Sequence, residues 1–155
     1  MCQKLETACE LFLDVICGPT QHINDTRIQV YVSGTPAGTS TMNMLHWEQG
    51  VLNDSFQMYD YGSNNENMKH YNSTTPPLYL LNTIPNSFKI ALFSGGHDYL
   101  ADPTDVTRLV AELPSESVVH HDIQDTYAHL DYTWAYDANS LIYNQVIDLL
   151  MEYKA

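Results

Sequence analysis

Residues 89–98, with the sequence KIALFSGGHD, carry the clearest indication of a fold in this chain of 155 residues. Their apolar run, Ile90–Phe93, follows the turn-forming pair Pro85-Asn86 and is closed by Gly95-Gly96. A short apolar run bounded in this way is typical of a buried strand in a parallel sheet. The stretch therefore predicts an α/β fold, for which the residues on either side must supply the helices and further strands.

The residues that follow this strand predict a helix, a second strand and a final helix. Asp102 is suited to the N-cap of the helix and Pro103 to its first position. Its apolar stripe consists of Val106, Leu109, Val110 and Leu113. Residues 117–123 predict the second strand, and an apolar stripe over 142–153 predicts the final helix, with Asp137 as its cap. This order of elements is typical of the last part of an α/β fold.

The first 87 residues have a different character. A helical stripe over residues 5–16 ends at Gly18-Pro19. Glycine, proline and asparagine are frequent after residue 20, which leaves room for a short strand at Arg27–Val32 and one helix near Met42–Leu52. We therefore expect two regions, with residues 1–87 forming short elements and ordered loops and residues 88–155 forming the layered part.

A carboxylate and an imidazole, both able to take part in acid–base chemistry, follow the two predicted strands. Asp98 comes after the first strand and His129 after the second. In open α/β sheets, catalytic groups gather beyond the carboxyl ends of the strands. An acid followed later in the chain by a histidine matches the last two members of an α/β-hydrolase triad. We therefore expect His129 to accept the proton of a serine nucleophile, and Asp98 to orient the imidazole and stabilise its charged form.

Neighbouring residues offer alternatives to both assignments. Asp102 and Asp105 suit the start of a helix, whereas Asp98 follows two glycines that allow the backbone to turn sharply, so Asp98 is preferred as the acid. His120 and His121 lie inside the predicted second strand, and their side chains point to opposite faces. They cannot bind one zinc ion together, so we expect neither a metal site nor a cofactor.

The serine nucleophile has no counterpart in these residues. An α/β-hydrolase presents its serine in a G-x-S-x-G turn between a strand and a helix. The nearest sequence, GTSTM at residues 38–42, lacks the second glycine and a strand before it. Because the serine precedes the acid and the histidine in this fold, we expect it to lie in a missing N-terminal half of the core. The chain alone is then expected to be inactive.

Composition limits the partners. Six Lys and Arg residues stand against 19 Asp and Glu residues, giving a formal charge of −13. Such a charge argues against nucleic acid and anionic membrane surfaces as the main partners. No apolar run reaches the roughly 18 residues that a transmembrane helix needs, and no signal peptide is recognisable at Met1.

Sequons and cysteines bear on the compartment. Sequons of the N-x-S/T type begin at Asn24, Asn53 and Asn72 and favour an exported glycoprotein, although asparagine-rich loops also produce this short motif by chance. The cysteines are Cys2, Cys9 and Cys17, which fit either one disulfide with a free thiol or three reduced thiols. Cys9 and Cys17 would lie about 12 Å apart along one helix, so Cys2–Cys9 is the more plausible pair.

Long segments of the chain resemble the acid lipases, which are the gastric and lysosomal lipases and their invertebrate relatives. The segments are TPAGTS (35–40), LHWEQ (45–49), YDYGS (59–63), HY (70–71), SGGHDYLAD (94–102) and HLDYTW (129–134). The resemblance extends from about Cys9 to Tyr153. It implies the C-terminal part of an α/β-hydrolase fold, preceded by part of a mostly helical cap or lid at residues 1–87.

The resemblance also implies a function. It suggests a lysosomal or secreted glycoprotein that hydrolyses neutral lipid esters, either triacylglycerols or cholesteryl esters, with Asp98 as catalytic acid residue and His129 as base. The alternative is a non-catalytic module, a lipid-binding or regulatory fragment that retains part of the core. That alternative would leave sheet edges and apolar faces uncovered.

Overall fold

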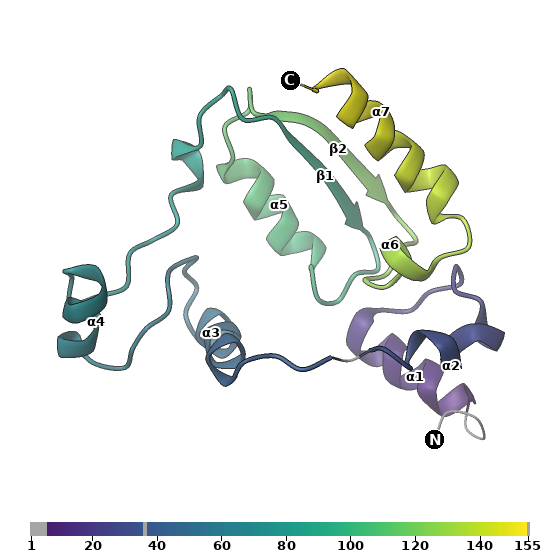
Figure 1. Cartoon of the computed structure of the whole chain (residues 1–155), viewed down its shortest axis with the longest axis horizontal. Coiled ribbons are helices and arrows are strands. Elements are labelled where there is room, and N and C mark those ends of the chain that lie inside the picture. The colour runs from purple at the N-terminus through teal and green to yellow at the C-terminus, as the bar shows by residue number, and fades with distance from the viewer. Residues whose placement is uncertain (1–5, 36, 155) are drawn as a thin grey trace. The chain divides into compact units, whose positions relative to one another are not determined.

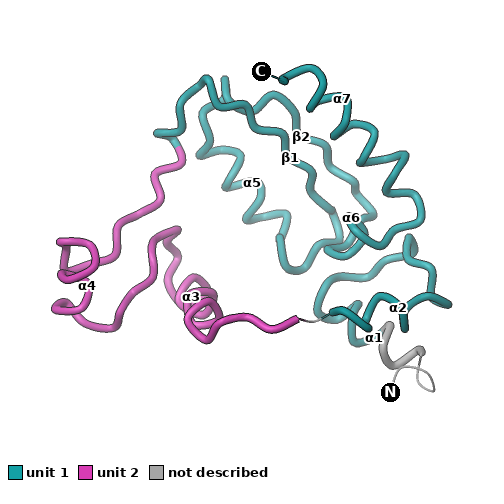
Figure 2. The backbone as a smooth tube through the Cα atoms, viewed as in Figure 1, with its two compact units in different colours: residues 1–35, 82–155 teal, residues 36–81 magenta. Residues whose placement is uncertain are grey.

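The chain folds into two compact units. The computed structural model describes the backbone of residues 6–35 and 37–154, and side-chain surroundings from residue 11 onward apart from residues 36 and 155. One unit combines residues 1–35 with 82–155, and the other comprises residues 36–81 (Figure 2). We call them the sheet unit and the inserted unit. The N-terminal segment thus belongs to the same unit as the strands, and the assignment of residues 1–87 to a cap stays a prediction.

A parallel pair of strands organises the sheet unit (Figure 1). Strand β1 covers Ile90–Gly95 and β2 covers Val118–Gln124, and in their register Ala91 is opposite His120. Helix α5, Pro103–Glu112, connects the strands and contacts β1. Both predicted strands and the helix between them are confirmed, so the sheet unit is a mixed α/β structure.

Helix α5 begins as the sequence predicts. Asp102 is its N-cap, and a carboxylate oxygen of Asp102 accepts a hydrogen bond from the Thr104 backbone N–H at 2.8 Å. This hydrogen bond holds the pKa of Asp102 below its usual value. Asp102 therefore caps the helix, as expected, and its carboxylate is engaged there.

The N-terminal part of the sheet unit is helical. Helix α1, Glu6–Cys17, is followed by a 3₁₀ turn at Asp25–Arg27 and by the short helix α2 at Ile28–Tyr31. The expected strand at Arg27–Val32 is therefore wrong. The Asn24 side chain accepts a hydrogen bond from the Thr26 N–H and starts a helical turn, which overrides the β-propensity of the branched residues that follow.

The last part of the chain contains more structure than expected. The segment between the second predicted strand and the predicted final helix, for which no element was expected, includes the short helix α6, Asp131–Trp134. A π-helical turn, Asn139–Tyr143, then leads into α7, Asn144–Glu152. Asp137 does not cap this helix with its side chain, because that carboxylate accepts a hydrogen bond from the Tyr127 hydroxyl at 2.7 Å.

The inserted unit consists of two helices and ordered loops. Helix α3 covers Thr41–Leu52, as predicted, and α4 covers Asn64–Tyr71, which the sequence analysis missed. Helix α4 has few apolar residues, so hydrophobic periodicity does not reveal it. Its capping residues reveal the helix instead. The Ser63 hydroxyl accepts a hydrogen bond from the Glu66 N–H at the start of the helix, and Asn72, just after its end, has a φ of 53°. A 3₁₀ turn at Leu81–Thr83 comes before β1.

The buried part of the sheet unit lies around the ends of the strands rather than between broad layers. The apolar residues that are less than 5% exposed are Ile28, Tyr127, Ala128, Ala138 and Ile142. Ile123 of β2 and Leu150 of α7, by contrast, are 55% and 66% exposed. None of the described helices is both long enough and apolar enough to cross a membrane.

Candidate active site

The two strands of the sheet unit end at the same edge, because they are parallel. The loops that follow them are joined by backbone hydrogen bonds. The Gly96 N–H donates to the Gln124 carbonyl and the His97 N–H donates to the Tyr127 carbonyl, each at 3.0 Å. These bonds bring the segment after β1, which carries Asp98, against the segment after β2, which carries His129.

Two glycines allow this close approach. A Cβ atom on Gly95 would lie 2.3 Å from the Tyr127 carbonyl oxygen, and one on Gly96 would lie 2.3 Å from the carbonyl oxygen of Asp125. The chain turns here as expected, with the Asp98 N–H 3.4 Å from the Gly95 carbonyl, but neither glycine has a positive φ, so the turn alone does not require glycine. They are required because the two loops touch along their backbones.

The Asp98 carboxylate and the His129 imidazole form a hydrogen-bonded pair. His129 Nδ1 lies 3.2 Å from Oδ1 and 3.1 Å from Oδ2 of Asp98. Asp98 is 4% exposed as a residue, whereas the His129 side chain is 42% exposed. The structure thus brings together the two residues that the strand-end argument selected, with a buried carboxylate behind an accessible ring.

Backbone N–H groups fix the orientation of the acid. Oδ1 of Asp98 accepts from the N–H groups of Leu100 and Ala101, both at 2.8 Å. His129 Nδ1 faces this anchored carboxylate, which favours the imidazole tautomer with its proton on Nδ1. Nε2 is then an acceptor, and no described residue forms a hydrogen bond to it. An imidazole held in this way can take a proton at Nε2 and return it.

Asp131 holds the turn that carries His129, and the sequence alone did not point to this residue. It is 0% exposed; its Oδ2 accepts from the Ala128 N–H and its Oδ1 from the Thr20 hydroxyl, both at 2.7 Å. Burial raises the pKa of Asp131 despite these hydrogen bonds. The carboxylate closes the turn that carries His129 and joins it to the N-terminal segment.

The sequence of this chain is similar to the sequences of several known proteins. No family model matches it. Gastric triacylglycerol lipase of Homo sapiens is 40% identical over 153 residues, which are 98% of this chain and 37% of that protein. Lysosomal acid lipase/cholesteryl ester hydrolase of Rattus norvegicus is 38% identical over 97% of this chain and 37% of its own length. The chain is homologous to the acid lipases.

The extent of the match is uneven. Lipase member K of Homo sapiens, 38% identical, is matched by 94% of this chain but over only 36% of its own length. Nearly all of this chain therefore matches the acid lipases, yet the chain spans only a little more than a third of the length of the curated relatives it matches.

A second polar network in this acid lipase homologue joins His22 to residues before and after His129 in the sequence. His22 Nδ1 is 2.9 Å from Oδ2 of Asp137, and His22 Nε2 is 2.9 Å from the Thr126 hydroxyl. Burial alone would raise the pKa of Asp137, but the hydrogen bonds from Tyr127 and His22 outweigh it and lower that pKa. Burial and the neighbouring Asp137 raise the pKa of Tyr127, which keeps its hydroxyl as a donor.

His22 could have been suspected only weakly from the sequence. It stands alone after a helix, 115 residues from Asp137, and no spacing rule connects the two. The signal that exists is local: the Thr20 hydroxyl accepts from the His22 N–H at 3.0 Å, in a turn typical of threonine.

The other two histidines considered as ligands lie on opposite faces of β2, as expected. His121 Nε2 is 2.9 Å from the hydroxyl of Ser94, and the His120 ring contacts Phe93 with centroids 5.2 Å apart. His120 Nε2 is buried and has no described partner. Within the part of the chain that the structure describes, no group of three His, Cys, Asp or Glu side chains is arranged to hold a metal ion.

The predicted modification sites differ in their surroundings. Asn24, Asn53 and Asn72 are all exposed. The Cys2–Cys9 pair lies outside the residues whose side chains are described. Cys17 is buried with a free thiol, and burial, with a smaller contribution from the charge of Asp98, raises its pKa.

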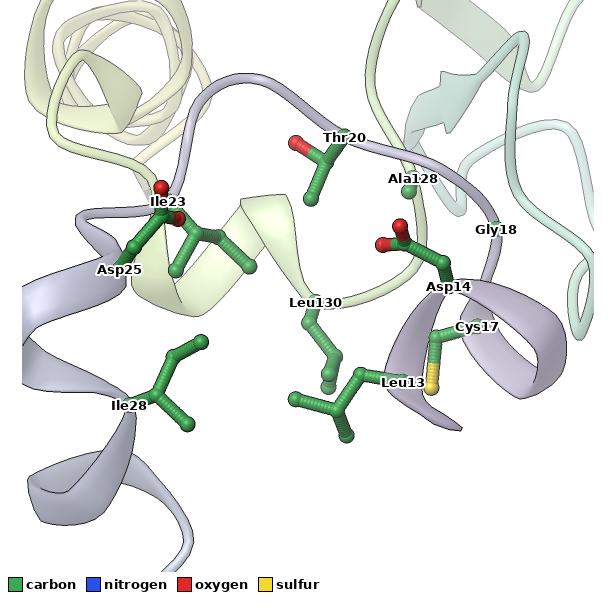
Figure 3. A pocket seen from close by; sticks show the side chains of 10 residues that line it. All are labelled: Leu13, Asp14, Cys17, Gly18, Thr20, Ile23, Asp25, Ile28, Ala128 and Leu130. Carbon is green, nitrogen blue, oxygen red and sulfur yellow. The ribbon is translucent and has the colours of Figure 1, made fainter. Parts of the chain in front are cut away.

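A pocket adjoins the histidine loop on the side of α1 (Figure 3). Ala128 and Leu130, which flank His129, form part of its wall. The figure shows the apolar side chains of Leu13, Ile28 and Leu130 directed into it. The remaining lining residues are Asp14, Cys17, Gly18, Thr20, Ile23 and Asp25. A pocket of mixed polar and apolar lining therefore adjoins the backbone that carries the candidate base.

Proposed function

We propose that this chain supplies the acid and the base of a serine ester hydrolase of the acid lipase type. The observation that carries the proposal is the contact of His129 Nδ1 with both oxygens of Asp98, at 3.1 and 3.2 Å, just beyond the ends of two adjacent parallel strands. The arrangement corresponds to the acid and base positions of an α/β-hydrolase. The corresponding architecture is the C-terminal part of a hydrolase core preceded by part of a cap at residues 1–87.

In the proposed reaction, His129 Nε2 removes the proton of a serine hydroxyl as the serine oxygen attacks the ester carbonyl carbon. Asp98 stabilises the imidazolium that forms. The imidazolium then donates its proton to the departing alkoxide, leaving an acyl-serine and an alcohol. Water, deprotonated by the same nitrogen, cleaves the acyl-serine to a carboxylic acid and restores the serine. The serine must come from outside these 155 residues, which contain no G-x-S-x-G sequence.

The proposed substrates are neutral lipid esters, either triacylglycerols or cholesteryl esters. The relatives' names, triacylglycerol lipase and cholesteryl ester hydrolase, support this substrate class. A gastric or lysosomal relative also supports a secreted or lysosomal location. Glycans at Asn24, Asn53 and Asn72 would suit either location, and all of these side chains are exposed.

A chimera tests the proposal. The matched 153 residues of human gastric triacylglycerol lipase are replaced by this chain, and hydrolysis of a triacylglycerol emulsion is measured. We expect activity that falls about 10³-fold or more in Asp98→Asn and in His129→Ala, by analogy with the removal of triad members. Asp102→Asn is the matched control, because it removes the same charge from the helix cap. Its loss of activity should be far smaller.

The outcomes separate the candidate functions. Equal losses for Asp98→Asn and Asp102→Asn would show that the acid is wrongly assigned. Retained activity in His129→Ala would remove the proposed base. Labelling by a fluorophosphonate is expected in the chimera and absent in the isolated 155-residue chain. A properly folded chimera that binds lipid emulsions but shows neither labelling nor turnover would favour the non-catalytic, lipid-binding alternative.

A further inference from the structure

The end of helix α1 touches both loops of the candidate active site. The carbonyl oxygen of Cys17, the last residue of the helix, accepts hydrogen bonds from the His129 N–H at 3.0 Å and from the Tyr99 N–H at 3.4 Å. Carbonyl groups in the last turn of a helix have no partner within the helix. Here one such carbonyl joins the residue after Asp98 to the backbone of His129 itself.

Gly18 makes this contact possible. Its φ is +98°, a conformation that other residues rarely adopt, and it is buried. A Cβ atom at this position would lie 1.7 Å from the carbonyl oxygen of His97 and 3.3 Å from the Cβ of Ala128. Gly18 therefore lies between the acid loop and the histidine loop and contacts the residue before Asp98 and the residue before His129.

Thr20 adds a further attachment on the histidine side. Its hydroxyl donates to Oδ1 of Asp131 at 2.7 Å, and Oδ2 of Asp131 accepts the Ala128 N–H at 2.7 Å. The backbone N–H groups of Ala128 and His129 are thus both held by residues 17–20, one through Asp131 and the other directly. The Asp98 loop and the His129 loop share one support that comes from more than 75 residues earlier in the chain.

We propose that residues 17–20 act as a positioning clamp for the Asp98–His129 pair, with Gly18 as its decisive residue. The clamp fixes the distance between the two loops, so that His129 Nδ1 stays within hydrogen-bond distance of Asp98. What the aligned pair catalyses rests on the proposed function, but the alignment itself does not. The inference can therefore be tested without any hydrolase activity.

The test is an NMR experiment on the complete 155-residue chain, labelled with ¹⁵N in its histidines. The proton on His129 Nδ1 should give a downfield resonance that disappears in His129→Ala and shifts in Asp98→Asn. In Gly18→Ala we expect this resonance to be lost, with at least tenfold faster exchange of the proton with water. Gly62→Ala is the matched control: Gly62 also has a positive φ, +82°, but a Cβ atom added there would have no neighbour within 4 Å.

The readout separates positioning from simple stabilisation. A purely structural role would lower the melting temperature of Gly18→Ala and leave the resonance unchanged well below that temperature, and this result would overturn the proposal. Thr20→Val keeps the test valid if Gly18→Ala does not fold. We expect amide exchange at Ala128 and His129 to be several-fold faster in Thr20→Val and unchanged in Thr20→Ser, which retains the hydroxyl. Unchanged exchange in Thr20→Val would contradict the clamp.

An inactive chimera with an intact His129 resonance would refute the proposed function and leave the clamp standing. An active chimera, together with a His129 resonance that is insensitive to both Gly18→Ala and Thr20→Val, would support the proposed function and refute the clamp.

Discussion

The sheet unit and the inserted unit are held together over very different distances along the chain. In the sheet unit, the hydrogen bonds of Thr20 with Asp131 and of His22 with Asp137 connect residues 111 and 115 positions apart. In the inserted unit, the Gln49 side chain makes its two hydrogen bonds to the backbone of Asp60, 11 positions away. The candidate active site therefore depends on contacts between the two ends of the sheet unit's sequence, whereas the inserted unit is held by shorter-range contacts such as that of the Tyr79 N–H with the Phe56 carbonyl.

The difference extends to the type of contact. Backbone approaches too close for a Cβ atom occur in the sheet unit, at Gly18, Gly95 and Gly96. Cβ atoms added at Gly38, Gly50 and Gly62 of the inserted unit would have no neighbour within 4 Å. That unit is held by backbone hydrogen bonds between residues 56–58 and 77–79 and by side chains, such as the stacked rings of Tyr61 and His70, whose centroids are 3.6 Å apart. Substitutions should consequently destabilise one unit and leave the other intact.

After Gly18→Ala, whose added Cβ would clash more severely, the largest such effect is expected for Gly95→Ala. The added methyl group would meet the carbonyl oxygen of Tyr127, a backbone atom that cannot move without separating the two loops. We expect a loss of about 3 kcal/mol in the stability of the sheet unit, typical of overpacking against a rigid neighbour. Hydrogen exchange with mass spectrometry at increasing urea concentration measures the stability of each unit separately.

Gly34→Ala serves as the control for this substitution, since no atom lies within 4 Å of the added Cβ there. Its effect on stability should be within about 0.5 kcal/mol. If Gly95→Ala protected the amides of β1 and β2 as well as Gly34→Ala does, close backbone packing would not be what joins the loops.

A smaller effect, confined to the inserted unit, is expected for Asn67→Ala. Asn67 is 2% exposed; its Oδ1 accepts from the Tyr61 N–H at 3.0 Å and its Nδ2 donates to Asp60 Oδ1 at 3.0 Å. Removing the amide leaves the Tyr61 N–H unpaired, whereas Asp60 Oδ1 still accepts from the Gly62 N–H, and we expect a cost of about 2 kcal/mol. The amides of residues 59–74 should exchange faster, while those of β1 and β2 should not.

Asn65→Ala is the control, because Asn65 lies in the same helix and is exposed. Faster exchange in β1 and β2 of Asn67→Ala would mean that the two units are energetically coupled rather than independent.

The smallest effect concerns the dependence of stability on pH. Because burial raises the pKa of Asp131 in the folded chain, folding favours its protonated form. The resulting contribution to stability is present at low pH and is lost as the pH rises through the folded-state pKa. Asp131→Asn can still accept the Ala128 N–H and donate to Thr20. Relative to wild type, this variant should therefore become more stable as the pH is raised from about 4 to 7.

Urea unfolding of both proteins across this pH range provides the measurement. Asp125→Asn, an exposed change in the preceding loop, is the control for the loss of one carboxylate from this part of the chain. A stability difference for Asp131→Asn that is flat, or that favours wild type with rising pH, would show that burial does not govern this carboxylate.

Local signals in the sequence predicted most of the sheet unit. The apolar run at Ile90–Phe93 and the cap at Asp102 correspond to β1 and to the start of α5. Both signals act within a few residues, through burial of the strand and through an N-cap hydrogen bond. The strand expected at Arg27–Val32 failed because branched residues indicate a strand only when a partner strand lies beside them.

Asp98 and His129 could be selected from the sequence because one topological rule places the ends of parallel strands together. Their separation of about 3 Å, and the burial of the carboxylate alone, could not be read in this way. The roles of Thr20 and His22 could not be predicted, because no pattern of residues near them in the chain indicates their distant partners.

The sequence by itself determined the order β1, α5 and β2, the cap of α5, the choice of Asp98 and His129 as candidates, and the homology to acid lipases, because each of these depends on neighbouring residues or on their order. Only the tertiary structure decided that the end of α1 reaches both loops and that Gly18, Thr20 and Asp131 support the histidine. Such contacts depend on which backbone segments meet in space. They join segments more than 75 residues apart, so no local pattern in the sequence reports the free energy of their packing.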